Sequence, residues 1–148
     1  MLTPRRTILL ARLMFCLGAC GLLVLMLGPF QGLEQVFGLN DKAAHVIAFY
    51  GLAIALFTIA PTRRRGDLSL FLVAAALGVE LLQGLTGRSV SVVDFLAGSL
   101  GVCAAWAPGQ IERLRHLART RPDHTFAEIA DDDKRRRRAA RSPAKVTA

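Results

Sequence analysis

Four long apolar segments constrain what this chain can fold into. They cover approximately residues 7–29, 43–60, 68–86 and 90–107. A helix needs roughly 20 apolar residues to cross a hydrocarbon core about 30 Å thick. The sequence therefore predicts an all-α integral membrane protein, a four-transmembrane-helix bundle. Proline interrupts helices, so Pro61 and Pro108 are expected to end the second and fourth spans.

Charged residues are separated from these apolar segments. Of the 148 residues, 53% are hydrophobic and 20% are charged, and 11 of the 19 Lys and Arg residues follow residue 108. We therefore expect a membrane domain at residues 1–108 and a basic cytoplasmic tail at residues 109–148. The basic excess lies in loops and in the tail, not on a folded basic face with interleaved aromatic residues. No nucleic-acid partner is expected.

The basic residues also predict an orientation. Arginines cluster at residues 5–12, at residues 63–65 and at residues 113–121, whereas the two other gaps hold only Lys42 and Arg88. Lys and Arg are enriched in cytoplasmic loops. We therefore expect the N- and C-termini in the cytoplasm and the gaps with Lys42 and Arg88 on the outer side.

The outer connector at residues 29–40 has an amphipathic pattern. Phe30, Leu33, Val36 and Phe37 recur at three- and four-residue spacing. Such a pattern is typical of a short helix lying in the membrane interface. We expect an interfacial helix here, either as an ordered connector or as a lid over a ligand.

Ionisable and polar residues recur near the outer end of the predicted spans. Asp41 and His45 are four residues apart, and Glu80 and Gln83 are three apart, so each pair shares a helix face. Because consecutive spans run in opposite directions, these residues are expected at one membrane depth. The predicted outer cluster consists of Asp41, Lys42, His45, Glu80, Gln83, Arg88 and Asp94.

Burying such groups within a span is costly. A charged side chain there costs on the order of 2.5–3.5 kcal/mol, and intramembrane ionisable residues are a functional-site hypothesis by default. The alternative is scaffolding, in which polar side chains tie helices together and Asp41 caps its helix.

Three functions remain open for this cluster. In a binding module, Lys42 and Arg88 would hold an anionic head group of an envelope lipid, since Arg suits phosphate. In a membrane-embedded hydrolase or transferase acting on lipid-linked phosphate, His45 would pair with Glu80 or Asp94 in acid–base catalysis. A proton-linked transport element using Glu80 would need a homo-oligomer to complete its path. No dense metal motif and no paired-cysteine spacing is present, so neither a metal nor a cofactor is expected.

Small residues recur along the fourth span. Ala97, Gly98, Gly101 and Ala105 fall at three- and four-residue spacing after Asp94. Small residues on one face let a neighbouring membrane helix approach closely. We expect this face to pack against another span.

The basic tail divides into two parts. Residues 109–121 place apolar residues on one side and arginines on the other, which predicts an amphipathic juxtamembrane helix attracted to anionic membrane lipids. Residues 131–148 contain adjacent acidic and basic blocks with almost no apolar residues. That composition predicts a disordered basic C-terminal tail.

Three motifs within residues 38–105 resemble the VanZ-like family of small bacterial membrane proteins. The strings are DKAAHVIAFYGLA, GVELLQGLTGR and SVVDFLAGSLG, beside the family pattern D-K-x-x-H, E-x-x-Q, an Arg and D-x-x-A-N-x-x-G. Gly98 stands where the family usually has Asn. The matching positions are Asp41, Lys42, His45, Glu80, Gln83, Arg88, Asp94 and Gly101.

The resemblance implies a four-span protein of the bacterial cytoplasmic (inner) membrane with a cell-envelope role. The family's founding member is linked with glycopeptide resistance, a role that the family name does not carry over to this chain. Together with the outer cluster, the resemblance predicts a protein that binds an anionic cell-envelope lipid head group or lipid-linked precursor. The alternative is a purely structural accessory membrane subunit.

Overall fold

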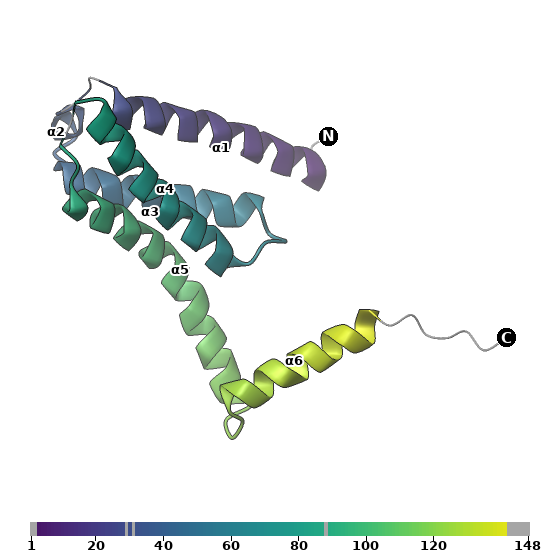
Figure 1. The fold of residues 1–148 in the computed structure, drawn as a ribbon. Helices are drawn as coiled ribbons and strands as arrows, with labels where there is room; N and C mark the ends of the chain where they lie inside the picture. Colours follow the sequence, from purple (N-terminus) through teal and green to yellow (C-terminus); the bar gives the residue numbers. More distant parts are fainter. Residues whose placement is uncertain (1–2, 29, 31, 88, 142–148) are drawn as a thin grey trace. The chain divides into compact units, whose positions relative to one another are not determined.

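The computed structural model describes residues 3–28, 30, 32–87 and 89–141. This part of the chain is helical and contains no strand (Figure 1). By internal contacts the chain divides into two units, residues 1–109 and residues 110–148, and each is described by itself. The helices are α1 (Pro4–Leu27), α2 (Leu33–Val36), α3 (Asp41–Ile59), α4 (Arg65–Leu85), α5 (Val92–Thr120) and α6 (Phe126–Arg141).

Helix boundaries follow from side-chain caps. The Thr3 hydroxyl accepts a hydrogen bond from the Arg6 main-chain N–H at 3.3 Å. The Asn40 side chain accepts from Ala43 N–H at 2.7 Å, and the Ser91 hydroxyl accepts from Asp94 N–H at 3.2 Å. Each cap satisfies one of the free N–H groups at a helix start, so α1, α3 and α5 begin where these residues lie.

Four of the helices, α1, α3, α4 and α5, are long and apolar enough to cross a membrane. This confirms the predicted helical segments, with bounds that shift by a few residues. The prediction that Pro108 ends the last one is wrong, because α5 continues through Pro108 to Thr120. Proline removes only one main-chain donor, and the residues that follow are mostly strong helix formers, which favours continuation.

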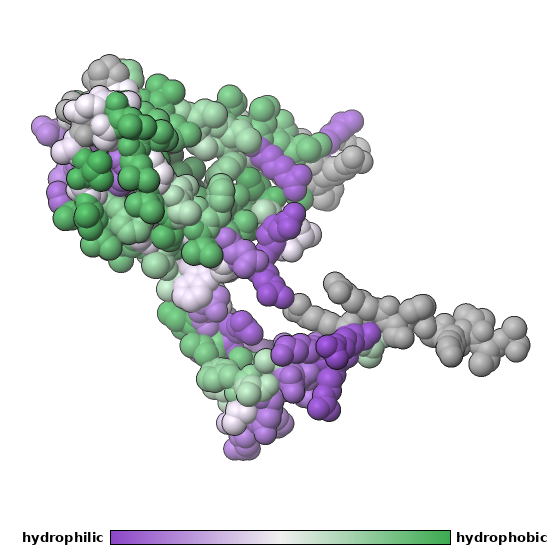
Figure 2. Space-filling model, viewed as in Figure 1, coloured by the Kyte–Doolittle hydropathy of each residue, from purple (hydrophilic) through white to green (hydrophobic). Residues whose placement is uncertain are grey.

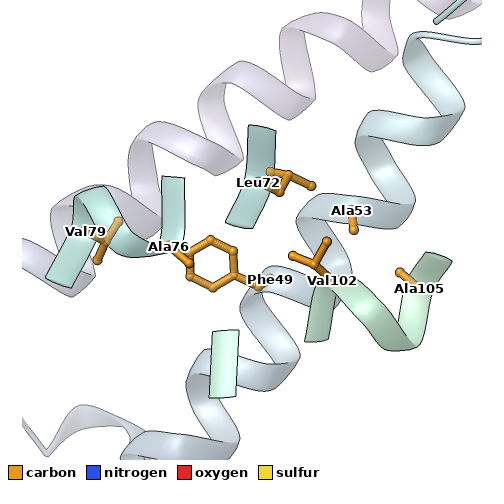
Figure 3. Packing of buried hydrophobic residues seen from close by; sticks show 7 residues of the cluster. All are labelled: Phe49, Ala53, Leu72, Ala76, Val79, Val102 and Ala105. Carbon is orange, nitrogen blue, oxygen red and sulfur yellow. The ribbon is translucent and has the colours of Figure 1, made fainter. Parts of the chain in front are cut away.

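The core of the first unit joins α3, α4 and α5. Phe49 lies at its centre, with Ala76 of α4 on one side and Val102 of α5 on the other (Figure 3). A Cβ atom at Gly101 would collide with the Val46 carbonyl oxygen, and one at Gly98 would lie 2.9 Å from the Phe49 ring. The small-residue face predicted from the sequence therefore packs against α3, as expected.

Helix α1 packs more loosely than the other three. It contacts α3 and α4, but none of its described residues is buried, and its apolar window is 0% buried. Side-chain hydrogen bonds join it to the bundle near both ends. Arg12 donates to the Ile59 carbonyl at 3.3 Å, and Gln83 donates to the Met26 carbonyl at 2.9 Å.

The helix expected at residues 29–40 is present but shorter than predicted. Among the described residues of this connector, only the four of α2 are helical, after Gly32, which has a φ of 86°. Leu33, Val36 and Phe37 remain exposed. Positive φ favours glycine, so the chain turns at Gly32 and again at Gly38, with a φ of 70°, and leaves no room for a longer helix.

The tail is more ordered than its composition predicted. Residues 131–141 belong to α6, so the expected disorder is wrong there, while residues 142–148 lie outside the described residues. Thr125 and Glu128 form a capping box, in which Thr125 N–H donates to the carboxylate at 2.8 Å and Glu128 N–H donates to the hydroxyl at 3.3 Å. This arrangement starts a helix, and the Ala and Arg residues that follow favour its continuation.

The two units differ in how hydrophobic their surfaces are. The visible surface of α1, α3 and α4 is mostly hydrophobic, whereas that of α6 is mostly hydrophilic (Figure 2). Many large apolar side chains of the first unit are exposed, among them Leu13, Met14 and Leu70. Exposed apolar surface on this scale indicates contact with lipid or with another protein.

Candidate functional site

The polar end of the first unit is where α3 and α5 begin and α4 ends. Four predicted cluster residues are buried there: His45 is 4% exposed, Glu80 1%, Gln83 4% and Asp94 9%. Two others remain open to the surroundings, since the side chains of Asp41 and Lys42 are 41% and 58% exposed. Arg88 lies outside the described residues. The sequence thus predicted correctly that these side chains gather at one end of the helices.

His45 is oriented by its own helix. Its Nδ1 lies 3.0 Å from the main-chain carbonyl oxygen of Asp41, one turn earlier, and 3.7 Å from the Asp41 carboxylate. A carbonyl oxygen can only accept a hydrogen bond, so Nδ1 carries a proton. The other ring nitrogen, Nε2, therefore points at α4 as an acceptor when the ring is neutral.

Glu80 bridges α4 to both neighbouring helices. Its Oε2 accepts a hydrogen bond from the Ser91 main-chain N–H at 3.0 Å, just before α5. Its Oε1 lies 3.5 Å from His45 Nε2. Among the described residues, neither of these two buried atoms has a hydrogen-bond partner.

The His45–Glu80 pair attaches α3 to α4 at the polar end. His45 Nε2 and Glu80 Oε1 face each other at 3.5 Å, and both atoms are buried.

Asp94 completes the contact of α5. Its Oδ1 lies 4.0 Å from Lys42 Nζ, and its main-chain N–H is capped by the Ser91 hydroxyl. Gln83 makes a different connection, because it faces α1 and donates to the Met26 carbonyl at 2.9 Å. Polar contacts at this end thus link all four long helices.

The cluster divides into two layers. The enclosed layer consists of His45, Glu80 and Asp94, whose atoms Nε2, Oε1 and Oδ1 have almost no accessible surface. The accessible layer consists of Asp41 and Lys42. Because a ligand can contact only accessible atoms, Asp41 and Lys42 can bind it directly, whereas His45 Nε2, Glu80 Oε1 and Asp94 Oδ1 can only hold the helices together.

Two pockets adjoin Asp41 of the accessible layer, and Lys42 lines neither of them. A polar pocket of about 290 Å³ is lined mainly by Glu34, Gln35, Asp41, Gln83, Ser89 and Asp94. A second pocket of about 250 Å³ is lined mainly by apolar residues of α1, α2 and α3, together with Glu34, Asp41, His45 and Gln83. The two pockets share a wall formed by Glu34, Asp41 and Gln83. A ligand with a polar and an apolar part would fit such a pair.

Sequence reasoning missed some members of the site. Ser91 both caps α5 and binds Glu80, and its position three residues before Asp94 is a recognisable helix-start signal. Glu34 lies in the outer connector and was not included in the predicted cluster, but it lines both pockets. The carbonyls of Asp41 and Met26 carry no signal in the sequence.

Metal chemistry has no support in this geometry. In the part of the chain that the structure describes, no three His, Cys, Asp or Glu side chains are placed to hold a metal ion. The catalytic candidates His45, Glu80 and Asp94 are also enclosed at the atoms named above. The arrangement supports binding at the accessible layer better than acid–base catalysis on a bound substrate.

Comparisons with known proteins give no further identification. No family model matches this chain, no curated protein matches it in sequence, and no solved structure matches its fold. The resemblance to the VanZ-like family therefore stays a prediction that rests on the three quoted motifs.

Proposed function

We propose that this chain is a VanZ-like, four-span protein of the bacterial cytoplasmic membrane that binds the head group of a cell-envelope lipid at its polar end. The observation that carries the proposal is the wall shared by the polar and apolar pockets, formed by Glu34, Asp41 and Gln83. A lipid has a polar and an apolar part joined in the same way.

The opposite end of the helices supports an outward-facing polar end. Arg12 lies beside the end of α3, and Arg63, Arg64 and Arg65 lie at the start of α4. Arginine-rich ends remain in the cytoplasm. The polar end would then lie in the outer leaflet, on the opposite side of the membrane from both termini of the chain.

The charges of the site refine the expected ligand. Lys42 is exposed and supplies a cation for a phosphate group. The polar pocket itself is lined by three carboxylates, those of Glu34, Asp41 and Asp94. Carboxylates attract an amine and repel a purely anionic group. The preferred head group is therefore one that carries an amine in addition to its phosphate.

A structural role is the second candidate, and the enclosed layer favours it. His45, Glu80 and Asp94 join three helices without exposing a reactive atom. If this is the whole function, the polar pocket binds no lipid selectively. The two candidates therefore differ in a measurable property.

Native mass spectrometry of the protein in mild detergent tests the proposal. Phosphatidylethanolamine, phosphatidylglycerol, phosphatidylcholine and a polyprenyl phosphate would be titrated separately. We expect the primary amine of phosphatidylethanolamine to give the tightest binding, since it can donate hydrogen bonds to carboxylates. Asp41→Asn should weaken this binding severalfold without weakening the binding of phosphatidylglycerol, because the lost carboxylate repels an anionic head group.

Asp67→Asn is the matched control. Asp67 is an exposed acid in the first turn of α4, so it lies at the opposite end from the polar pocket. The control should bind every lipid as wild type does. Equal affinity for all four lipids, with no response to Asp41→Asn, would refute head-group binding and favour the structural role.

A further inference from the structure

A groove runs between α1 and α3, away from the polar end. It has a volume of about 540 Å³ and a mainly apolar lining. Small residues form much of it because they leave space between the two helices. They are Ala11, Gly18 and Ala19 of α1 and Ala48, Gly51 and Ala55 of α3.

The groove adjoins the pockets of the polar end. Leu22, Ile47 and Ala48 line both the groove and the apolar pocket. The apolar pocket in turn shares a wall with the polar pocket, as described above. The three spaces therefore follow one another from the polar end along α1 and α3.

We propose that this groove holds one acyl chain of the lipid whose head group occupies the polar end. The inference rests on the proposed head-group binding and extends it, because it assigns the α1–α3 groove as the chain site. The bound lipid would then be recognised by its chain as well as by its head group.

The width of the groove favours a single chain over a helix of another protein. The path from Ala11 to Leu22 is roughly 17 Å long at about 1.5 Å per residue, so the groove volume of about 540 Å³ gives a mean cross-section of about 30 Å². A helix about 10 Å across with its side chains has a cross-section of about 80 Å². A helix from a second copy could therefore enter only in part, whereas an acyl chain is much thinner.

The packing of α1 agrees with this role. Hydrogen bonds join it to the bundle near its two ends, through Arg12 and through the Met26 carbonyl, and no described residue between them is buried. The middle of α1 thus forms one side of a space that the protein itself leaves open. Lipid is the abundant apolar component that can fill it.

Three glycines of α1 and α3 have open space beside them in which a larger side chain can be placed. A Cβ atom at Gly18, Gly51 or Gly21 would meet nothing within 4 Å. Gly18 and Gly51 line the groove, whereas Gly21 lies on α1 outside its lining. Gly18→Leu and Gly51→Leu are therefore test variants, and Gly21→Leu is a matched control with the same change in helix propensity.

The experiment measures dissociation constants for two phosphatidylethanolamines, one with long chains and one with six-carbon chains, by native mass spectrometry of the full chain. Gly18→Leu and Gly51→Leu should weaken binding of the long-chain lipid about tenfold, because each leucine displaces about two methylene groups from the groove. Binding of the short-chain lipid should be unchanged. Gly21→Leu should bind both lipids as wild type does.

Each alternative result has a distinct meaning. If the groove variants bind the long-chain lipid normally while Asp41→Asn still weakens both lipids, the acyl-chain site is refuted and head-group binding stands. If Asp41→Asn has no effect on either lipid, head-group binding itself fails. If Gly18→Leu instead converts a dimer into a monomer in the same spectra, a second copy occupies the groove and the acyl-chain inference is wrong.

Discussion

The two units of the chain use polar side chains in opposite ways. In the first unit, buried groups join segments that are far apart in sequence, as Glu80 does with His45 and with Ser91. In the second unit, most ion pairs are exposed and lie within one helix, as in Arg115–Glu112 and Lys134–Asp131. The exception is Arg121, which pairs with Asp132 of α6. The polar groups of the first unit therefore position helices relative to one another, whereas the charges of the second unit keep its helices in contact with water.

The energetic consequences differ accordingly. An exposed ion pair contributes roughly 0–1 kcal/mol, whereas breaking a buried pair costs about 3–5 kcal/mol because one charge is left uncompensated. Burying ionisable groups is costly, so their presence at the polar end calls for an explanation, which ligand binding in the adjoining pockets would provide. The charges of the second unit need no explanation beyond solubility and attraction to anionic lipid.

The largest expected effect comes from separating α5 from α3. Gly101→Ala would place a Cβ against the Val46 carbonyl and 2.9 Å from the Tyr50 main-chain nitrogen. These are backbone atoms of a helix, which cannot move aside, so we expect a loss of about 3 kcal/mol in the free energy of unfolding. Detergent-induced unfolding followed by circular dichroism would measure it.

Gly78→Ala is the control for that substitution. Nothing lies within 4 Å of a Cβ at Gly78, and alanine is the better helix former. This variant should be as stable as wild type or slightly more stable. Equal losses at both glycines would show that α3 and α5 are not in close contact.

Removing the buried acid should have the next largest effect. Glu80→Leu leaves the Ser91 N–H and His45 without their partner on α4. A polar group left unsatisfied costs about 1–3 kcal/mol, and the hydrogen bond that is lost is that of the Ser91 N–H, so we expect a loss of about 2 kcal/mol. Glu112→Leu in the second unit removes only exposed pairs and should change the stability of the protein by less than about 1 kcal/mol.

Glu80→Gln tests whether this position needs a carboxylate. A glutamine keeps the length of the side chain, can accept from the Ser91 N–H and can donate to His45 Nε2. We expect this variant to stay within about 1 kcal/mol of wild type. A loss as large as that of Glu80→Leu would show that the carboxylate itself is required.

The smallest expected effect is in the second unit. Hydrogen bonds from the Thr125 N–H and hydroxyl lower the pKa of Glu128 below its ordinary value of 4.5. The stabilisation of α6 by this carboxylate is therefore complete above pH 4.5 and is lost as the pH falls through the lowered pKa. A carbon-detected NMR titration of the Glu128 carboxyl should show the lowered pKa, and Thr125→Ala should return it toward the ordinary value. An unchanged titration in that variant would contradict the capping box.

The sequence predicted most of the residues that meet at the polar end, but not Ser91 or Glu34. The four-residue spacing of Asp41 and His45 and the antiparallel order of the spans determine their shared depth. The sequence could not separate the enclosed layer from the accessible one, because that depends on how each helix is rotated. Glu80 and Gln83 share a helix face by spacing, yet one contacts α3 and the other α1.

The sequence-based errors have a common physical cause. Pro108 and the charges of residues 131–141 were taken as signals that end a helix or keep the chain disordered. Local capping and strong helix formers outweigh them in α5 and α6. Composition describes average tendencies, whereas a capping box such as Thr125–Glu128 acts at one position.

The most direct test of the central claim compares one accessible and one enclosed residue. Phosphatidylethanolamine affinity and lipid-free thermal stability would be measured on the same preparations of wild type, Lys42→Gln and Glu80→Leu. We predict that Lys42→Gln weakens lipid binding about tenfold through loss of a charge-assisted hydrogen bond, with little change in melting temperature. Glu80→Leu should lower the melting temperature by several degrees. Wild-type lipid affinity in Lys42→Gln, or lost binding at unchanged stability in Glu80→Leu, would contradict the division into a layer that binds and a layer that supports.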